Sequence, residues 1–335
     1  MSHLPKSATA LALCIALLLP TLALSACGGG DPDLVVYSGR SEPLLKPFLD
    51  EFAAREGLDV EVRFGETAGL VGTLLEEGEN TQADVFIGQD AAALERLATE
   101  ELLQPYDGFE RMPARYRSAD LEWTGLSGRA RVLIVPAGGE HPDSIFDLTD
   151  PEWRGRIAAP APTNVSFRDW VSAIRLERGD DFARSYLEGL KANDMEILAT
   201  HGEVQAAVGE GEFDIGLVNH YYVELGKRLG SPVEAIYTDQ APGGFGVVFN
   251  VASAGITRSA DDPENARKLM DYLLSDDVQE RFAEANFEYP LLPGLEAEPG
   301  VQPLDDVRIT DVPLSELGPA AEGTDRLLDE VGLDR

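Results

Sequence analysis

Strand-like and helix-like segments alternate along this chain from residue 34 onward. Strands that alternate with helices of this length favour βαβ units on a parallel sheet. The sequence therefore predicts an α/β fold. In the first block, the strand-like segments are 34–37, 60–64 and 84–87, and the helix-like segments are 44–54, 69–77 and 91–103.

A second α/β block follows, and two long extended stretches, 125–136 and 243–257, flank it. We interpret these stretches as paired hinge strands that join two lobes. The expected N-terminal lobe comprises 34–130 and 247–295, and the expected C-terminal lobe comprises 131–246 and 296–335. The other expected strands are 131–136, 156–159, 196–199 and 213–218, and the other helices are 167–178, 181–191, 203–208, 222–229, 263–274, 278–285 and 324–331.

The first 26 residues read as a secretory signal, because Lys6 precedes an apolar run at 8–19 that is short for a membrane span. The segment ends in Leu24-Ser-Ala-Cys27, which resembles the lipobox of bacterial lipoproteins. That resemblance implies cleavage before Cys27 and lipidation of it, with 27–33 as a tether. The alternative is an ordinary signal with a chance cysteine. Cys14 lies inside the signal, so the mature chain is expected to have no internal disulfide.

Charge is the unusual part of the composition. The net charge is −33, and 1–26 contains one charged residue, Lys6, so its removal leaves the rest still more acidic. Such a surface should repel nucleic acid and anionic lipid. No second apolar run approaches membrane length, so we expect a soluble body attached to the membrane only through the lipid.

Tyr221 and Tyr222 follow the strand-like segment 213–218. Neighbours on a strand point to opposite faces, so two phenols would share a site only where a helix begins. Asn219 is a good N-cap candidate, which would place both tyrosines in the first helical turn. Two hard oxygen donors with an ordinary pKa near 10 suit a hard, highly charged ion such as Fe(III). Partly buried packing or an interface is the alternative.

Two lobes on a tether are the architecture of a solute-binding protein, which closes two domains around its ligand. Several strand-to-helix turns would face the space between the lobes. Helix N-termini there would present unpaired N–H groups to an anion.

The chain resembles the bacterial ferric-ion-binding proteins of iron ABC transporters, from about residue 34 to the C-terminus. The family implies a type II periplasmic-binding-protein fold and a partnership with a permease and ATPase complex. The matching motifs are Val36-Tyr-Ser-Gly-Arg40, Ala83-Asp-Val-Phe86, Leu126-Ser-Gly-Arg-Ala-Arg-Val132, Pro151-Glu-Trp-Arg-Gly-Arg156, Asn219-His-Tyr-Tyr222 and Glu288-Tyr-Pro-Leu-Leu-Pro293.

The resemblance also implies a ligand set. Tyr221 and Tyr222 fall where the family places two tyrosinate iron ligands. A synergistic anion, such as carbonate, would be held by groups at a helix start and by nearby polar side chains. The matching positions for this anion are Arg129, Thr163, Asn164 and Asn219. The alternative to anion binding by Arg129 is a structural salt bridge at the hinge.

Several positions depart from the family pattern. Ser41 stands where one subclass has a histidine ligand, and Gln89 stands where it has a glutamate. Ser166 replaces a third tyrosine of another subclass, and His201 replaces an asparagine that binds the anion. Asp90, next to Gln89, is the candidate replacement carboxylate, with a solvated acid as the alternative. His201 and His220 are candidate nitrogen donors.

We therefore expect a monomeric, lipid-anchored, extracytoplasmic Fe(III)-binding protein that delivers iron to an ABC importer. A binding protein for a small organic anion, such as a sugar phosphate or a phosphonate, remains the alternative. The sequence lacks the zincin, α/β-hydrolase and P-loop motifs, so we do not expect an enzyme.

Overall fold

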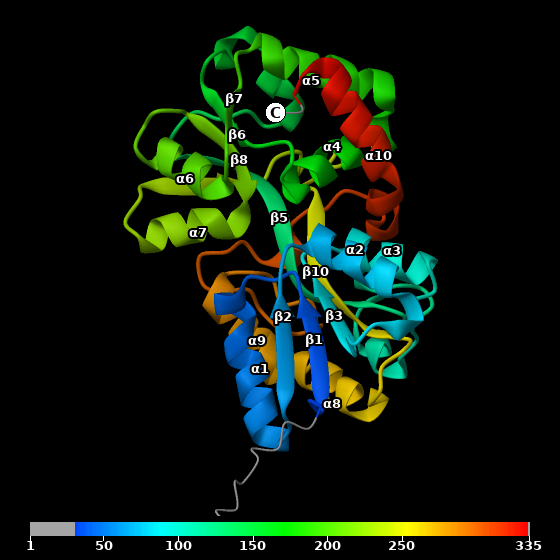
Figure 1. The fold of residues 1–335 in the computed structure, drawn as a ribbon. Helices are drawn as coiled ribbons and strands as arrows, with labels where there is room; N and C mark the ends of the chain where they lie inside the picture. The colour runs from blue at the N-terminus through cyan, green and yellow to red at the C-terminus, as the bar shows by residue number, and fades with distance from the viewer. Residues whose placement is uncertain (1–30, 334–335) are drawn as a thin grey trace, which may run out of the picture. The chain divides into compact units, whose positions relative to one another are not determined.

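The computed structural model describes residues 31–333 (Figure 1). The predicted signal and Cys27 lie outside these residues. The description below concerns the unit that begins at Pro32. Among the described residues, no helix combines the length and apolar character needed to cross a membrane.

The first block is built as predicted, from strands that alternate with helices. β1 is buried along its whole length and pairs in parallel with β2 on one side and β3 on the other. Asp90 caps α3, and the helix-like segment 91–103 divides into α3 and the short strand β4. The elements are β1 (Leu34–Ser38), α1 (Glu42–Glu56), β2 (Val60–Phe64), α2 (Thr67–Glu77), β3 (Val85–Gly88), α3 (Ala91–Thr99) and β4 (Leu103–Gln104).

The second block repeats this arrangement. β6 lies between β7 and β8 and is parallel to both. All predicted helices of this block form, each within two residues of its expected bounds. The elements are β6 (Ile157–Pro160), α4 (Val165–Arg178), α5 (Asp180–Ala192), β7 (Glu196–Leu198), α6 (His201–Gly209), β8 (Ile215–Asn219), α7 (His220–Arg228) and β9 (Val233–Ile236), of which β9 was not predicted.

Two long strands connect the blocks. β5 (Thr124–Pro136) pairs with β10 (Phe249–Thr257) through its first half and with β8 and β9 through its second half. Figure 1 shows β5 running from one half of this unit into the other. These pairings are antiparallel, so the long strands make the sheet mixed, whereas β1–β3 and β6–β8 pair in parallel as predicted. β10 runs antiparallel because it carries the chain back into the first block, between β3 and β5.

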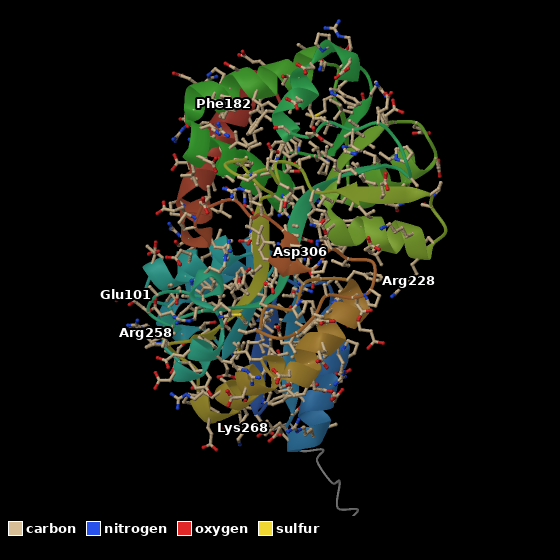
Figure 2. The ribbon with its side chains drawn as sticks, turned by 180° about the vertical axis from the view of Figure 1, so that it is seen from behind. Glu101, Phe182, Arg228, Arg258, Lys268 and Asp306 are labelled. Atoms are coloured by element: carbon tan, nitrogen blue, oxygen red, sulfur yellow. The ribbon has the colours of Figure 1, made fainter. Side chains whose placement is uncertain are left out.

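Gly128 allows close packing where the long strands meet. A Cβ atom there would lie 2.1 Å from a ring carbon of Phe249. The Gly128 backbone also pairs with Tyr289, and Val247 forms a bridge with Ile309. The segment after α9 therefore crosses the long strands, and Asp306 marks it in Figure 2. The predicted extended stretch 243–257 forms a strand only from Phe249 onward.

The C-terminal part of the chain is helical. α8 and α9 match their predictions, whereas α10 begins ten residues earlier than expected and contains Pro319. α10 packs against α3, α4 and α5, so it contacts both blocks. The lobe boundaries remain a prediction. These helices are α8 (Pro263–Leu273), α9 (Asp276–Asn286) and α10 (Leu314–Val331), and the short 3-10 helices are Gly78–Asn80, Asp107–Arg111, Ala114–Tyr116, Ile145–Thr149, Pro151–Trp153 and Leu304–Asp306.

Candidate metal and anion site

The junction of β8 and α7 positions the tyrosine pair. Asn219 occupies the N-cap position of α7 as predicted, but its side chain makes no capping hydrogen bond. Its Oδ1 accepts from Nη1 of Arg131, and its Nδ2 donates to Ser166 Oγ at 3.3 Å and to the Tyr221 hydroxyl at 3.2 Å. Asn219 therefore links a buried guanidinium to the first tyrosine.

Tyr221 and Tyr222 both lie in the first turn of α7 and are half-buried. Their ring centroids are 4.6 Å apart. Burial raises the pKa of Tyr222, and so does Tyr221, whereas Arg129 and Arg131 lower it. Deprotonation of Tyr222 consequently requires a strongly polarising cation.

Two histidines flank this pair. His201 stacks on Tyr222 with centroids 5.1 Å apart, and its Nε2 lies 3.2 Å from Asn164 Oδ1. Burial lowers the pKa of His201 to about 3, so its ring is neutral at ordinary pH. Its Nδ1 is buried without a hydrogen-bond partner among the described residues.

The contacts of His220 indicate a structural role instead. Its Nδ1 accepts from the Ala130 amide at 3.2 Å, and its Nε2 donates to the Phe287 carbonyl at 2.7 Å. Its ring stacks on Tyr289 at 4.5 Å. Both ring nitrogens are therefore engaged by backbone groups, which leaves neither free for a metal ion in this arrangement.

The first block contributes few free oxygen ligands. Ser41 is exposed at the N-cap position of α1. The Gln89 carbonyl accepts from Nη2 of Arg129. Asp90 is 4% exposed and accepts from the Ala93 amide at 2.8 Å, so it caps α3. In the described residues, no group of three or more histidine, cysteine, aspartate or glutamate side chains has an arrangement suited to a metal ion.

Arg129 and Arg131 are alternate residues of β5, and alternate residues on a strand point to the same face. Both are almost fully buried. Arg131 donates from Nε to the Ser166 carbonyl at 3.0 Å, at the start of α4. Arg129 and Arg131 each retain one Nη atom with no partner within 31–333. Burial, and then the charge of Arg129, lowers the pKa of Arg131 to about 9, so it is still charged at neutral pH.

The start of α4 holds the other predicted anion residues. Asn164 caps this helix, since its Oδ1 accepts from the Ser166 amide at 2.9 Å. Thr163 precedes it and is exposed. Asn164 thus shares the neighbourhood of His201 and Ser166, while the roles of Thr163 and Asn164 toward an anion remain predictions.

Sequence reasoning missed two residues near the tyrosines. Arg40, which follows β1, interacts electrostatically with Tyr221 and forms a buried ion pair with Glu288 at 2.7 Å. Arg131 was placed in a predicted strand and in a matching motif, but it was given no role at the site. The spacing of Arg129 and Arg131 in an extended segment was the available signal, because it places both guanidiniums on one face.

Comparison with known proteins supports the fold and the class of protein. A 28% identical relative, the Fe(3+)-binding periplasmic protein of Serratia marcescens, aligns over 95% of this chain and 97% of its own. The crystal structure of iron-bound HitA from Pseudomonas aeruginosa has a TM-score of 0.81 at 28% identity, covering 89% of this chain and 99% of HitA. This match confirms the predicted periplasmic-binding-protein fold.

A third similar structure contains both iron and citrate. The Trichodesmium protein IdiA (FutA), in complex with iron and citrate ligands, has a TM-score of 0.78 at 26% identity and covers 89% of this chain and 99% of its own. These relatives are solute-binding proteins, which agrees with the expectation that this chain is not an enzyme. The model of the bacterial extracellular solute-binding proteins matches residues 34–288, and the chain therefore belongs to that family.

Proposed function

We propose that this protein binds Fe(III) outside the cytoplasm through tyrosinates at Tyr221 and Tyr222, together with a small anion. The observation that carries this proposal is the pair of phenol rings 4.6 Å apart at the start of α7, within electrostatic range of two buried guanidiniums. Iron-binding relatives align over nearly the whole chain and support the same ligand.

The anion is assigned to the region between Arg129 and the start of α4. A small anion such as carbonate would accept hydrogen bonds from Arg129 and from Thr163 and Asn164, while Asn219 holds the neighbouring Tyr221 hydroxyl. Asp90 remains the candidate first-block ligand, and its Oδ1 already accepts a hydrogen bond from the Ala93 amide.

The proposal also includes delivery of the iron to a transporter. The protein would act as a monomer, anchored through lipidated Cys27, and pass iron to the permease and ATPase complex of an ABC importer. Its lobes would be those expected from the sequence, with β5 and β10 as the hinge. No nucleic acid takes part, since the net charge of −33 would repel it.

A visible tyrosinate-to-iron absorption band tests the proposal. The purified mature protein should develop this band with Fe(III) and bicarbonate, and Tyr221→Phe or Tyr222→Phe should weaken or remove it. Tyr272→Phe is the matched control, because that phenol lies on α8, where its ring packs 5.5 Å from Phe52. A wild-type protein without the band would contradict iron binding.

One observation favours a second candidate, a metal-free site for a small organic anion. The first-block carboxylate expected at the site, Asp90, caps a helix, whereas Arg129 and Arg131 have unpartnered donors within the described part of the chain. Thermal stabilisation by a sugar phosphate or phosphonate, without any absorption band on adding iron, would favour this candidate.

A further inference from the structure

Three consecutive residues after α9, at 287–289, contact both blocks. On the side of the first block, Glu288 forms its buried ion pair with Arg40. On the side of the second block, the Tyr289 hydroxyl lies 2.8 Å from the hydroxyl of Tyr237, the residue after β9. The 287–289 segment is therefore fixed to the first block and reaches the second.

The helix that carries the tyrosine pair meets this segment at both of its ends. At the start of α7, His220 Nε2 donates to the Phe287 carbonyl, and the His220 ring stacks on Tyr289. At the end of α7, the Arg228 guanidinium lies over the Phe287 ring, with Cζ 4.3 Å from the ring centroid. Figure 1 shows α7 at the edge of the second block that faces the first, and Figure 2 labels Arg228 at this edge. One residue of the first block thus contacts both ends of a nine-residue helix.

The backbone of Phe287 indicates that its ring is needed at this position. Phe287 follows the last residue of α9 in the left-handed conformation, with φ at +57°. Gly57 and Gly332 occupy the same position after α1 and α10, also in the left-handed conformation. Glycine is the usual residue there, because a side chain is disfavoured at positive φ. A phenylalanine in this conformation costs free energy, which points to a role for its ring.

Arg228 is the partner of this ring. Its side chain is exposed and forms no ion pair with the described residues, whereas the preceding Lys227 pairs with Glu224 at 2.7 Å. A cation over an aromatic face is attracted by the charge distribution of the ring, and more strongly where water is excluded. Phe287 is 8% exposed, so its ring is largely shielded from water. This contact consequently restrains the end of α7.

The orientation of α7 affects both phenols at once. Tyr221 and Tyr222 lie in its first turn, so a tilt of the helix moves both hydroxyls together. The ligands of a metal site must be held within about 0.5 Å and 10–20° of their working geometry. A helix held only at its start can tilt about that end, and then only a fraction of the iron-free molecules presents both tyrosines correctly. The apparent affinity for iron falls by that fraction.

We propose that the contact between Arg228 and Phe287 positions the tyrosine pair for iron by fixing the end of α7 against the first block. Both are positioning residues, because they act on the tyrosines through the helix. This inference rests on the proposed function. It also links iron ligation in the second block to the first block by a route other than the long strands, since Phe287 is bonded to Glu288, the partner of Arg40.

The test titrates the mature protein with Fe(III) in bicarbonate and follows both bound iron and the tyrosinate-to-iron band. Arg228→Gln and Phe287→Leu should each weaken iron binding about 3- to 10-fold and change the band intensity per bound iron. The double variant should lose no more than either single variant, because the two side chains form one contact. Arg228→Lys keeps a cation over the ring and should bind nearly as the wild type does. Thermal unfolding of iron-free Arg228→Gln should match the wild type, which separates positioning from a loss of folding.

Two matched controls lie away from α7. Arg115→Gln removes an exposed arginine whose Cζ lies 5.3 Å from the ring centroid of buried Tyr116. Phe282→Leu alters a buried ring of α9 that stacks on Phe48, with centroids 4.3 Å apart. Both variants should keep the wild-type affinity and band, even though Phe282→Leu lowers the unfolding temperature.

The outcomes separate this inference from the proposed function. A wild-type protein that develops the band, together with unchanged affinity in Arg228→Gln and Phe287→Leu, overturns the inference alone. Losses that add in the double variant, or equal losses in the two controls, also overturn it, because they would reflect general destabilisation. A wild-type protein without the band overturns the proposed iron binding and this inference with it.

Discussion

The buried arginines near the tyrosine pair fall into two groups that differ in how completely they are paired. The first is Arg40 alone, and the second is Arg129 with Arg131. Arg40 forms a bidentate ion pair with Glu288, at 3.1 and 2.7 Å, and Ser127 donates to the same carboxylate at 2.8 Å. Burial alone would raise the pKa of Glu288, but the charge and hydrogen bonds of Arg40 hold it below its ordinary value. This pair is complete without any ligand.

Arg129 and Arg131 form the contrasting group. Each has one nitrogen without a partner among the described residues, and no carboxylate approaches either closer than 4.0 Å. The difference separates two uses of buried charge: a paired arginine stabilises the fold, whereas an incompletely paired one is available to a ligand. Substitutions should therefore affect folding in the first group and binding in the second.

The largest effect is expected from Glu288→Gln. Removing the carboxylate leaves Arg40 buried without a counter-ion, which should lower the free energy of unfolding by about 3–5 kcal/mol. Urea unfolding of the iron-free protein measures this loss. Glu264→Gln is the control, because its pair with Lys268 is exposed and should contribute less than about 1 kcal/mol. Similar losses in the two variants would remove the contrast between the arginine groups.

A pH-dependent effect of similar size is expected at His220, whose two ring nitrogens both form hydrogen bonds with backbone groups, so it too is fully paired without a ligand. Burial lowers the pKa of His220 to about 4 from its ordinary value of 6.5. The unfolded chain therefore takes up a proton that the folded protein does not, and stability is lost as pH falls from 6.5 toward 4. The loss from this residue should be about 3 kcal/mol.

His220→Gln should make the unfolding free energy less dependent on pH across this range, even if it lowers stability at every pH. Urea unfolding at a series of pH values measures the slope. His141→Gln is the matched control, since His141 is exposed, and it should keep the wild-type slope. An unchanged slope in His220→Gln would mean that the buried ring does not remain neutral in the folded protein.

Much of the fold follows from hydrophobic periodicity. The strands and helices of both blocks lie close to their predicted bounds because each buries one face or both. β9 was missed because only its first residue is buried, so it has no periodic signal. The first half of α10 was missed because Pro319 normally disfavours a helix interior, and its packing on α3 and α4 offsets this local cost.

The candidate site was less predictable. The residue types and a single helix start were enough to place Tyr221 and Tyr222 together. Arg131 required the register of β5 against β8, which decides that its side chain meets Asn219. The pairing of Arg40 with Glu288 joins residues 248 positions apart, and no local pattern reports such a contact.

Arg129→Gln tests the second group directly. It removes a buried charge that has no close carboxylate, so the unfolding free energy of the iron-free protein should change by less than about 1 kcal/mol. Binding should suffer more: loss of a charge-assisted hydrogen bond to the anion should weaken iron binding about 10- to 100-fold in bicarbonate. Titration followed by the absorption band measures this. A large stability loss with unchanged binding would assign Arg129 to the hinge instead.

The smallest effect is expected from Thr163→Val, which separates charged from neutral contacts to the anion. Thr163 is exposed before α4, and its hydroxyl would contribute one neutral hydrogen bond while the backbone amides of the helix start are kept. Iron binding in bicarbonate should weaken by only about 2- to 10-fold, with no measurable loss of stability. A loss as large as that of Arg129→Gln would place the anion at the start of α4 rather than at the guanidiniums, because a neutral donor could matter equally only if the anion relied on the helix N-terminus.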